Sequence, residues 1–481
     1  MAEQGAPALI CVLDIGKTNV KLNAMTAEGD VLETMAIANP TRSGLPWRHH
    51  DLEGLSDWVF DELSSLSRRH PIQTFVAAAH GSGGVLVGDD PDQGDGAVLP
   101  MIDYEQPLPS EVLNAYAPLA GSFHDRGSAV MHGATHQARQ LLWMEMAEPE
   151  RFAEGRAFLC LPQYFAWRMT GIAVSEATCL GAQSHLWNIP DERPTPIVVA
   201  RNWERLLPPF RPAWSRLGVL RPALAKRFGL PPSLDVLTGI HDSSANFYRY
   251  QAAGLSDAAI VSTGTWIVGM SASTPLTGLN EAAGMTINSD VFGQAVAGAL
   301  AMGGREFVHV AGNSVDLAAD AQTAIKLMTN GTMALPSFGE GDGFFPGSAG
   351  RGRIIGPSPT NDHERRTLAL IYMALLSVEC LEALQARGTA VLDGSYLKDP
   401  LFARLVRAFR GEAETLFNLD AYGVATGAAL LASHGKGLAS EALHLSKPET
   451  LEMPSERIAA YHRDWRQAAR RLGIQTGKEN P

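Results

Sequence analysis

The chain has few of the features that mark secreted or membrane proteins. Only four of its 481 residues are cysteine, and Cys11, Cys160, Cys179 and Cys380 have no close spacing, so we expect neither a disulfide framework nor a metal site. No apolar run approaches the roughly 20 residues that cross a bilayer. Residues 1–8 lack the basic segment and apolar core of a secretory leader. These absences predict a cytoplasmic protein with no membrane partner.

Basic residues are also in the minority, because 39 lysines and arginines face 51 aspartates and glutamates for a formal net charge of −12. That balance disfavours nucleic acid as a partner. It does not exclude a small phosphorylated ligand, whose charge backbone donors and a metal can offset locally. A chain of this length usually forms two domains, and a cleft between domains is a common ligand site.

Two short turns in opposite halves of the chain have the same design. Residues 13–19 and 261–266 each end an apolar β-type run, turn through glycine and hydroxyl residues, and enter another apolar run. Such turns can direct backbone N–H groups at phosphate oxygens. Either turn alone is also compatible with ordinary turn chemistry, and Lys17 with a solvated side chain. We predict that both bind nucleotide phosphates, through Asp14, Gly16, Lys17, Thr18 and Asn19 in the first turn and Thr263, Gly264 and Thr265 in the second.

The strand pattern of the first half restarts in the second. We expect strands over 9–13, 20–25, 31–37 and 75–79, then over 258–262, 266–270 and 285–288. This restart predicts an internally duplicated β-meander core in an α/β protein of two domains. The expected domains are 1–246 and 247–440, followed by a helical tail over 441–481.

Helical patterns lie between and after these strands. We expect helices over 128–146, from Asn361 to a stop at Gly388, over 400–409 and over 423–432. A short strand over 389–392 precedes a glycine turn at Gly394 and Ser395. Strand, glycine turn and helix in this order are frequent at nucleotide sites, so these two residues are further nucleotide-binding candidates.

Asp242 is the candidate catalytic residue. Phosphoryl transfer to a hydroxyl needs a base within hydrogen-bond reach of its proton, and a carboxylate is sufficient. The same residue could instead be the N-cap of a helix that starts at this point, and both interpretations can hold together. His241 could orient this carboxylate or be a structural group. Asp14, at the end of the first strand, could hold magnesium or cap its own hairpin.

Candidates for sugar recognition are less specific. His80 follows an apolar strand, and Asp103, Tyr104 and Glu105 follow a turn; with His241 and Asp242 they offer the polar and aromatic groups that a polyol requires. Either set could equally belong to a surface loop. Trp266, just after the second turn, is expected to pack in the core.

The order of these motifs resembles that of the FGGY family of carbohydrate kinases, in particular its rhamnulokinase-like and fuculokinase-like members. Residues 14–19 match the first phosphate loop of the family, residues 239–245 the stretch with its catalytic base, and residues 261–266 its second loop. Two differences stand out: the adenosine segment near Gly394 lacks the usual Gln-x-x-Ala-Asp stretch, and residues 103–105 occupy the place of a Trp-x-Asp motif.

This resemblance implies two ribonuclease-H-like domains of the actin, Hsp70 and sugar kinase type, with ATP and magnesium in the interdomain cleft and sugar bound mainly by the N-terminal domain. The expected activity is transfer of the γ-phosphoryl group of ATP to a ketose or deoxyketose, with Asp14 near the metal and Asp242 as general base. Homodimer formation stays open. Two alternatives are a nucleotide- and sugar-binding regulatory protein without transfer, which would not need the base, and an acyl-phosphate-forming kinase, which would need a carboxylate site.

Overall fold

The computed structural model describes residues 8–314, 317–435 and 443–474. Their contacts divide the chain into two compact units. The first contains Met1–Gly254, Ile287–Ala295 and Tyr422–Ala442, and the second contains Leu255–Thr286, Val296–Ala421 and Leu443–Pro481. Two later segments of the chain therefore pack with the first unit. The segment 1–7, for which we expected no leader, lies outside the described residues, as do 441–442 and 475–481 of the expected helical tail.

The first unit contains a seven-stranded sheet, formed by β1 (Leu9–Ile15), β2 (Asn19–Met25), β3 (Val31–Ala38), β6 (Ile72–Ala79), β11 (Arg216–Val219), β12 (Asp235–Leu237) and β13 (Ile240–His241). Its order is β11-β12-β6-β1-β2-β3, with β13 also paired to β6. β1, β2 and β3 form an antiparallel meander, whereas β6 runs parallel to β1, β12 and β13. This arrangement confirms the predicted opening meander.

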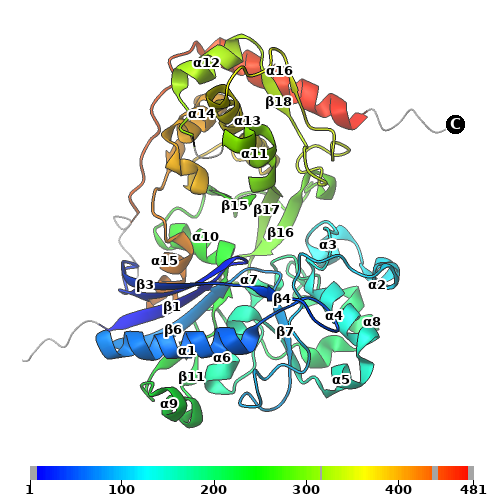
Figure 1. Cartoon of the computed structure of the whole chain (residues 1–481), viewed down its shortest axis with the longest axis vertical. Coiled ribbons are helices and arrows are strands. Elements are labelled where there is room, and N and C mark those ends of the chain that lie inside the picture. Colours follow the sequence, from blue (N-terminus) through cyan, green and yellow to red (C-terminus); the bar gives the residue numbers. More distant parts are fainter. Residues whose placement is uncertain (1–7, 315–316, 436–442, 475–481) are drawn as a thin grey trace, which may run out of the picture. The chain divides into compact units, whose positions relative to one another are not determined.

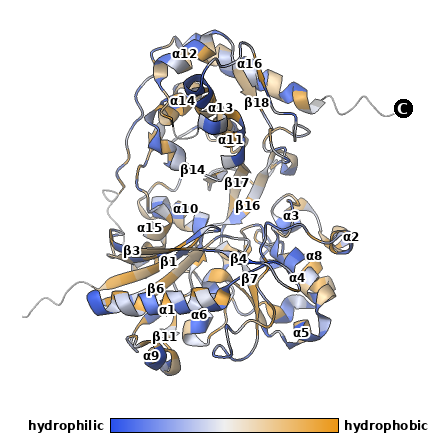
Figure 2. Cartoon of the chain, in the orientation of Figure 1, coloured by the Kyte–Doolittle hydropathy of each residue, from blue (hydrophilic) through white to orange (hydrophobic). Residues whose placement is uncertain are grey.

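The side chains of β1 alternate between two hydrophobic layers, as the two-residue period of a strand requires. Cys11 and Leu13 pack in the layer that includes α1 (Leu52–Arg69), α6 (Leu161–Thr170) and α9 (Pro222–Phe228). Ile10 and Val12 pack on the opposite face with α10 (Asp242–Ala252) and α15 (Gly423–Ala429). Figure 1 shows α1 on one side of this sheet and α10 with α15 on the other, and Figure 2 shows the hydrophobic colouring of β1 and β6.

The remainder of the first unit surrounds a smaller core. Its helices are α2 (Ser110–Tyr116), α3 (Phe123–Arg126), α4 (Gln137–Ala147), α5 (Pro149–Glu154), α7 (Ala177–Leu180) and α8 (Pro196–Ala200). Its short strand pairs are β4 (Thr41–Arg42) with β5 (His49–His50), β7 (Gly84–Val87) with β8 (Ala157–Cys160), and β9 (Trp187–Asn188) with β10 (Arg193–Pro194).

The helix predicted over 128–146 is wrong in its first half, because α4 begins only at Gln137. Gly133 has a φ of +57°, a left-handed conformation that does not continue a right-handed helix. His136 precedes the helix, and its ring accepts the Met131 N–H at 2.7 Å and contacts the Gln183 carbonyl at 2.8 Å. Tertiary hydrogen bonds of this kind leave no periodic signal in the sequence.

The second unit shares the centre of its sheet with the first: an antiparallel hairpin whose first strand also pairs in parallel with a later strand. Most of a six-stranded sheet lies in this unit, formed by β14 (Ala259–Thr263), β15 (Trp266–Ser271), β16 (Met285–Ser289), β17 (Ala295–Met302), β20 (Ala390–Gly394) and β21 (Thr415–Phe417); the part of β16 from Ile287 onward and the first residue of β17 are counted with the first unit. The order is β16-β17-β15-β14-β20-β21, with antiparallel pairs on the β15 side of β14 and parallel pairs on its β20 side. The first two strands of the meander are thus repeated as predicted, but the third predicted strand, 285–288, lies beyond β17 and does not pair with β15.

A large hydrophobic core packs around one helix of this second unit. The helices are α11 (Gly304–Ala311), α12 (Ala321–Thr329), α13 (Asp362–Ala383), α14 (Pro400–Arg410) and α16 (Ser455–Ile474), with the strand pair β18 (Met333–Leu335) and β19 (Arg353–Ile355). α13 starts as predicted, because the Asn361 side chain accepts the Glu364 N–H at 2.9 Å. It ends at Ala383, before the expected stop at Gly388.

The described residues contain no helix that is long and apolar enough to cross a membrane. All four cysteines are buried and none forms a disulfide.

Candidate active site

Three neighbouring parallel strands of the first unit end beside one another. Asp14 on β1 and Ile240 on β13 both pair with Ala78 of β6, one from each side. The strands then lead to His80 after β6 and to Asp242 after β13. In open α/β sheets the carboxyl ends of adjacent strands are the usual place for a ligand. The predicted metal ligand, base and one sugar-binding candidate therefore come from the same edge of one sheet.

Asp14 is half-buried at this edge. Burial and, to a smaller extent, the negative charge of Asp242 raise the pKa of its carboxyl to about 6, against the opposing charge of Lys21. Asp14 and Asp242 come from strands that flank β6, and the charge of Asp242 contributes to the raised pKa of Asp14. Two neighbouring carboxylates at a strand edge form a site that attracts a cation.

Asp242 is the first residue of α10, and His241 occupies the N-cap position without a side-chain capping bond. The predicted N-cap role of Asp242 is therefore wrong by one residue. Its Oδ1 accepts the Ser243 backbone N–H at 2.5 Å and the Ser243 hydroxyl at 3.1 Å. A carboxylate in the first helical turn is favoured by the helix dipole. These contacts fix the orientation of the candidate base while its side chain stays 27% exposed.

His241 links Asp242 to the buried part of the unit. Its Nε2 lies 3.1 Å from Asp242 Oδ1 and its Nδ1 lies 3.2 Å from the Ser244 hydroxyl. Burial lowers the pKa of His241, with Asp242 opposing that shift. The His241 backbone N–H donates to the Thr178 hydroxyl at 3.0 Å, and that hydroxyl donates to Glu176 at 2.5 Å. His241 thus has the contacts of a group that orients Asp242.

The first predicted phosphate turn connects β1 to β2. The Gly16 N–H donates to the Asn19 carbonyl at 2.9 Å, which closes the hairpin, and Thr18 and Asn19 are exposed. Asn39 braces the turn, since its side chain donates to the Gly16 carbonyl at 2.9 Å and its backbone N–H donates to the Thr18 carbonyl at 2.8 Å. Asn39 therefore holds the turn in place, and the exposed residues Thr18 and Asn19 remain accessible to a ligand.

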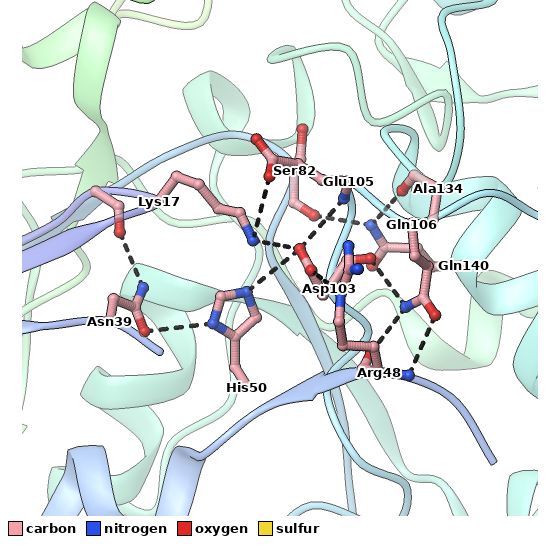
Figure 3. A network of polar contacts seen from close by, with 11 residues as sticks. Lys17, Asn39, Arg48, His50, Ser82, Asp103, Glu105, Gln106, Ala134 and Gln140 are labelled. Atoms are coloured by element: carbon pink, nitrogen blue, oxygen red, sulfur yellow. Dashed lines mark hydrogen bonds and ion pairs between the residues drawn. The ribbon is translucent and has the colours of Figure 1, made fainter. Parts of the chain in front are cut away.

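Lys17 extends from this turn toward the sugar candidates rather than into solvent (Figure 3). Its ammonium forms an ion pair with Asp103, lies 3.9 Å from Glu105 and sits 5.2 Å from the centre of the Tyr104 ring. The Tyr104 ring centre lies 5.3 Å from that of His80. The candidates at 80 and 103–105 therefore form one cluster, and Lys17 contacts that cluster.

Sequence reasoning missed several partners in this cluster. Arg48 donates from Nε to Asp103 Oδ2 at 2.5 Å, and His50 Nε2 lies 4.0 Å from Asp103 Oδ1. The Gln106 side chain donates to the Arg48 carbonyl at 2.7 Å and to the Asp103 carbonyl at 2.9 Å. Arg48 and Asp103 are 55 positions apart along the chain, and no local pattern marks their contact. A run of polar residues at 48–51, just before α1, was the one available signal.

The second predicted phosphate turn lies in the second unit, at one end of its sheet. Thr263 on β14 is paired with Gly394 on β20, and the Thr263 hydroxyl donates to the Asp393 carbonyl at 2.8 Å. The Ser395 hydroxyl donates to the Thr263 carbonyl at 3.3 Å. Gly394 has a φ of +96°, and a Cβ there would come within 2.1 Å of the Thr263 carbonyl oxygen. The two glycine turns predicted to bind nucleotide are thus neighbours, and Gly394 tolerates no side chain.

Another glycine pair adjoins this turn and was not predicted. The N–H groups of Gly303 and Gly304, at the start of α11, donate to the Thr265 carbonyl at 2.9 and 3.0 Å. A Cβ on Gly303 would approach the Gly264 carbonyl oxygen to 2.9 Å. Trp266 is half-buried rather than part of the core, so the expectation for that residue is wrong.

The residues at the strand ends of the first unit fit a magnesium ion. No group of three or more His, Cys, Asp or Glu residues with metal-binding geometry occurs in the described parts of the chain. Magnesium commonly uses one or two carboxylates together with substrate phosphates and water. Asp14, whose burial raises its pKa, supplies a carboxylate that a cation would stabilise in its charged form.

Comparison with known proteins settles the family. A model of the N-terminal domain of the FGGY family of carbohydrate kinases matches residues 9–247, and a model of carbohydrate kinase FGGY C-terminal domains matches residues 256–441. The chain belongs to the FGGY family of carbohydrate kinases. Kinases of this family use ATP and a carbohydrate. The match of both domains confirms the predicted resemblance and the two-domain α/β fold.

L-Fuculokinases are similar to this FGGY chain. The Escherichia coli K12 enzyme is 24% identical over 294 residues, which is 59% of this chain and 61% of the relative, and the Haemophilus influenzae enzyme is 23% identical over 272 residues, 54% and 56% of the two chains. This similarity supports the fuculokinase-like branch. The alignments span only about three fifths of the relatives' length.

Solved structures cover nearly the whole chain. A carbohydrate kinase from Novosphingobium aromaticivorans is 28% identical, with a TM-score of 0.83, and the match covers 96% of this chain and 99% of that one. A ligand-bound xylulose kinase from Lactobacillus acidophilus is 15% identical, with a TM-score of 0.79 and coverage of 98% and 99%, and shares the fold. The FGGY fold therefore extends through both units.

The raised pKa of Asp14 predicts that replacing this residue stabilises the ligand-free protein. A folded-state pKa of about 6 against an ordinary 3.8 means that the charged carboxylate disfavours folding above pH 6, and the penalty disappears as pH falls toward 4. We expect Asp14→Asn to raise the free energy of unfolding at pH 7.5 by about 1–3 kcal/mol in urea titrations. The exposed Asp30→Asn is the matched control. An unchanged or lower stability of Asp14→Asn would contradict the assigned environment.

Proposed function

We propose that this FGGY chain transfers the γ-phosphoryl group of ATP to a hydroxyl of a small sugar, a ketose or deoxyketose, with Asp242 as the general base. The observation that carries the proposal is the meeting of Asp14 and Asp242 at the ends of neighbouring strands, where the charge of one raises the pKa of the other. Similarity to L-fuculokinases supports a deoxyketose among the candidate sugars.

The proposed chemistry needs only a few steps from the chain's own residues. The sugar hydroxyl donates its proton to Asp242 as its oxygen bonds to the γ-phosphorus; the bond to the β-phosphate oxygen breaks and ADP leaves. His241 holds the Asp242 carboxylate in place through its Nε2. A magnesium ion, held by Asp14 and the phosphates, would offset negative charge.

The glycine turns are assigned to the nucleotide. The proposed phosphate donors are the backbone N–H groups of Lys17 and Thr18 in the first turn and of Thr265 in the second, because the N–H groups of Gly16 and Gly264 already close their turns. Gly394 and Ser395 are assigned to the adenosine part because a glycine at 394 lets the backbone approach a ligand closely. His80, Asp103, Tyr104 and Glu105 are assigned to the sugar, and the ion pair with Asp103 favours the sugar side for Lys17 as well.

A sugar panel with coupled detection of ADP tests the proposal. Ketoses, deoxyketoses, aldoses and polyols are offered with ATP and magnesium, and we expect ADP release that depends on one class of ketose. Omission of the sugar is the control, because hydrolysis alone would release ADP without it. Binding of ATP and sugar by the protein without any turnover would instead indicate a regulatory protein and contradict the proposal.

A further inference from the structure

A short series of hydrogen bonds connects the first phosphate turn to a histidine in the sugar cluster (Figure 3). The Asn39 side chain donates from Nδ2 to the Gly16 carbonyl at 2.9 Å, while its Oδ1 lies 3.3 Å from His50 Nδ1. Both Asn39 and His50 are buried. The amide of Asn39 is therefore fixed in one orientation, with its oxygen toward the imidazole.

This orientation determines which nitrogen of His50 carries the proton. An amide oxygen only accepts hydrogen bonds, so Nδ1 of His50 must be the donor. Burial and the positive charge of Lys17 lower the pKa of His50 to about 4, against the opposing charge of Asp103. The imidazole is therefore neutral at pH 7, and its Nε2 carries a lone pair.

That lone pair has no donor among the described residues. His50 Nε2 is buried without a hydrogen-bond partner, and the group across from it is Asp103 Oδ1 at 4.0 Å, which is also an acceptor. Asp103 is already bound by Lys17 and Arg48. His80 is nearby, with ring centres 6.5 Å apart, and both of its nitrogens also lack partners in the described structure. A buried polar atom without a partner is costly in a folded protein, and at His50 the neighbouring sugar candidates make a substrate hydroxyl the fitting partner.

We propose that His50 is a specificity-determining residue of the sugar site, whose Nε2 accepts a hydrogen bond from one substrate hydroxyl, and that Asn39 is the residue that positions it. This inference rests on the proposed sugar kinase function. The required ligand is a polyol with a hydroxyl that donates at this point. An analogue that lacks the hydroxyl, or carries it as a methyl ether, leaves the acceptor unpaired and is rejected. Asn39 also couples this recognition to the phosphate turn through Gly16.

The test compares the best sugar of the panel with analogues that lack one hydroxyl each. The wild-type enzyme should lose at least about tenfold in kcat/KM for one particular deoxy analogue. His50→Phe keeps a ring but removes the acceptor. In this variant the ratio of kcat/KM for the sugar to kcat/KM for the deoxy analogue should fall close to one. His49→Phe is the matched control, because the adjacent ring contacts the Trp47 carbonyl instead, and it should keep the wild-type ratio.

Asn39→Leu separates positioning from simple structural support. It removes the acceptor that fixes the His50 tautomer, so the discrimination between sugar and deoxy analogue should shrink although His50 is intact. A purely structural role would lower turnover of both substrates equally and leave the ratio unchanged. An unchanged ratio in both His50→Phe and Asn39→Leu would overturn the inference, while sugar-dependent turnover by the wild type would still support the kinase.

A measurement on the wild-type protein tests the inference even if the variants fail to fold. With histidine labelled on its imidazole nitrogens, the NMR signal of His50 Nε2 should be that of an unprotonated nitrogen and should shift toward the hydrogen-bonded position when the sugar is added without nucleotide. A signal that does not move at saturating sugar would overturn the inference. A shift without any turnover in the presence of ATP would uphold the sugar contact and reject the kinase proposal.

Discussion

Replacing Asp242 with asparagine is expected to lower kcat of sugar phosphorylation by at least about a hundredfold, the usual contribution of a positioned general base. Asparagine keeps the size of the side chain and can still accept the Ser243 N–H at the start of α10. It cannot take the proton of the substrate hydroxyl. The sugar should therefore still bind, and the loss should appear in kcat rather than in the sugar affinity. Steady-state kinetics with the best sugar and ATP measure this split.

A matched control for this variant is available in the second unit. Asp362 is likewise the first residue of a helix, α13, and its side chain is exposed. Asp362→Asn should change helix stability slightly and leave phosphorylation at the wild-type rate. Turnover by Asp242→Asn equal to that of the wild type would remove Asp242 from the role of base.

The first unit is expected to lose stability at a higher pH than is usual for acid denaturation. Burial lowers the pKa of His50 to about 4 and the pKa values of His80 and His136 to about 3, against an ordinary 6.5. These imidazoles are neutral in the folded state, so the unfolded chain binds more protons below pH 6.5, and stability falls as pH decreases. Each histidine should remove about 2 kcal/mol by pH 5, or roughly 6 kcal/mol together. Protonation of Asp14 over the same pH range stabilises the folded state, but by a smaller amount.

Urea unfolding at several pH values between 7.5 and 5 measures this effect. Below pH 6, His80→Gln should lower the number of protons taken up on unfolding by nearly one. The free energy of unfolding should therefore fall less steeply with decreasing pH than in the wild type. His132→Gln, which alters an exposed histidine of the same unit, is the control against which the effect of His80→Gln is measured. A free energy of unfolding that stays constant from pH 7.5 to 5 would contradict the buried, neutral state of these groups.

The sheets could be predicted because their signals are local. The strand β1 is apolar on both faces, the turn at Gly16 follows directly, and the same sequence of strand, turn and strand returns at β14. Asn361 and Glu364 marked the start of α13 for the same reason, since a cap is read within one helical turn. By contrast, the absence of a helix before Gln137 depends on Gly133 and on His136, whose ring is held by the Met131 N–H and the distant Gln183 carbonyl.

Residues of the candidate site could be predicted only where they belong to a local sequence motif. Asp14 and Asp242 each stand in a recognisable local pattern, and the sheet register brings their strands together. Arg48 and His50 carry no such pattern, because their relation to Asp103 is made by the folded chain. The direction of Lys17 was unpredictable for the same reason: the turn sequence suggests phosphate or solvent, and only the position of Asp103 draws the ammonium toward the sugar cluster.

The fate of the γ-phosphoryl group tests the central claim most directly. ATP that carries a radioactive label on that group is incubated with the protein, magnesium and the best sugar of the panel, and the products are separated. We predict one labelled sugar phosphate for each ADP formed, and almost no labelled sugar phosphate from Asp242→Asn at the same sugar occupancy. Label that appears only as inorganic phosphate, or remains in ATP while both ligands are bound, would contradict the assignment of this strand edge to phosphoryl transfer.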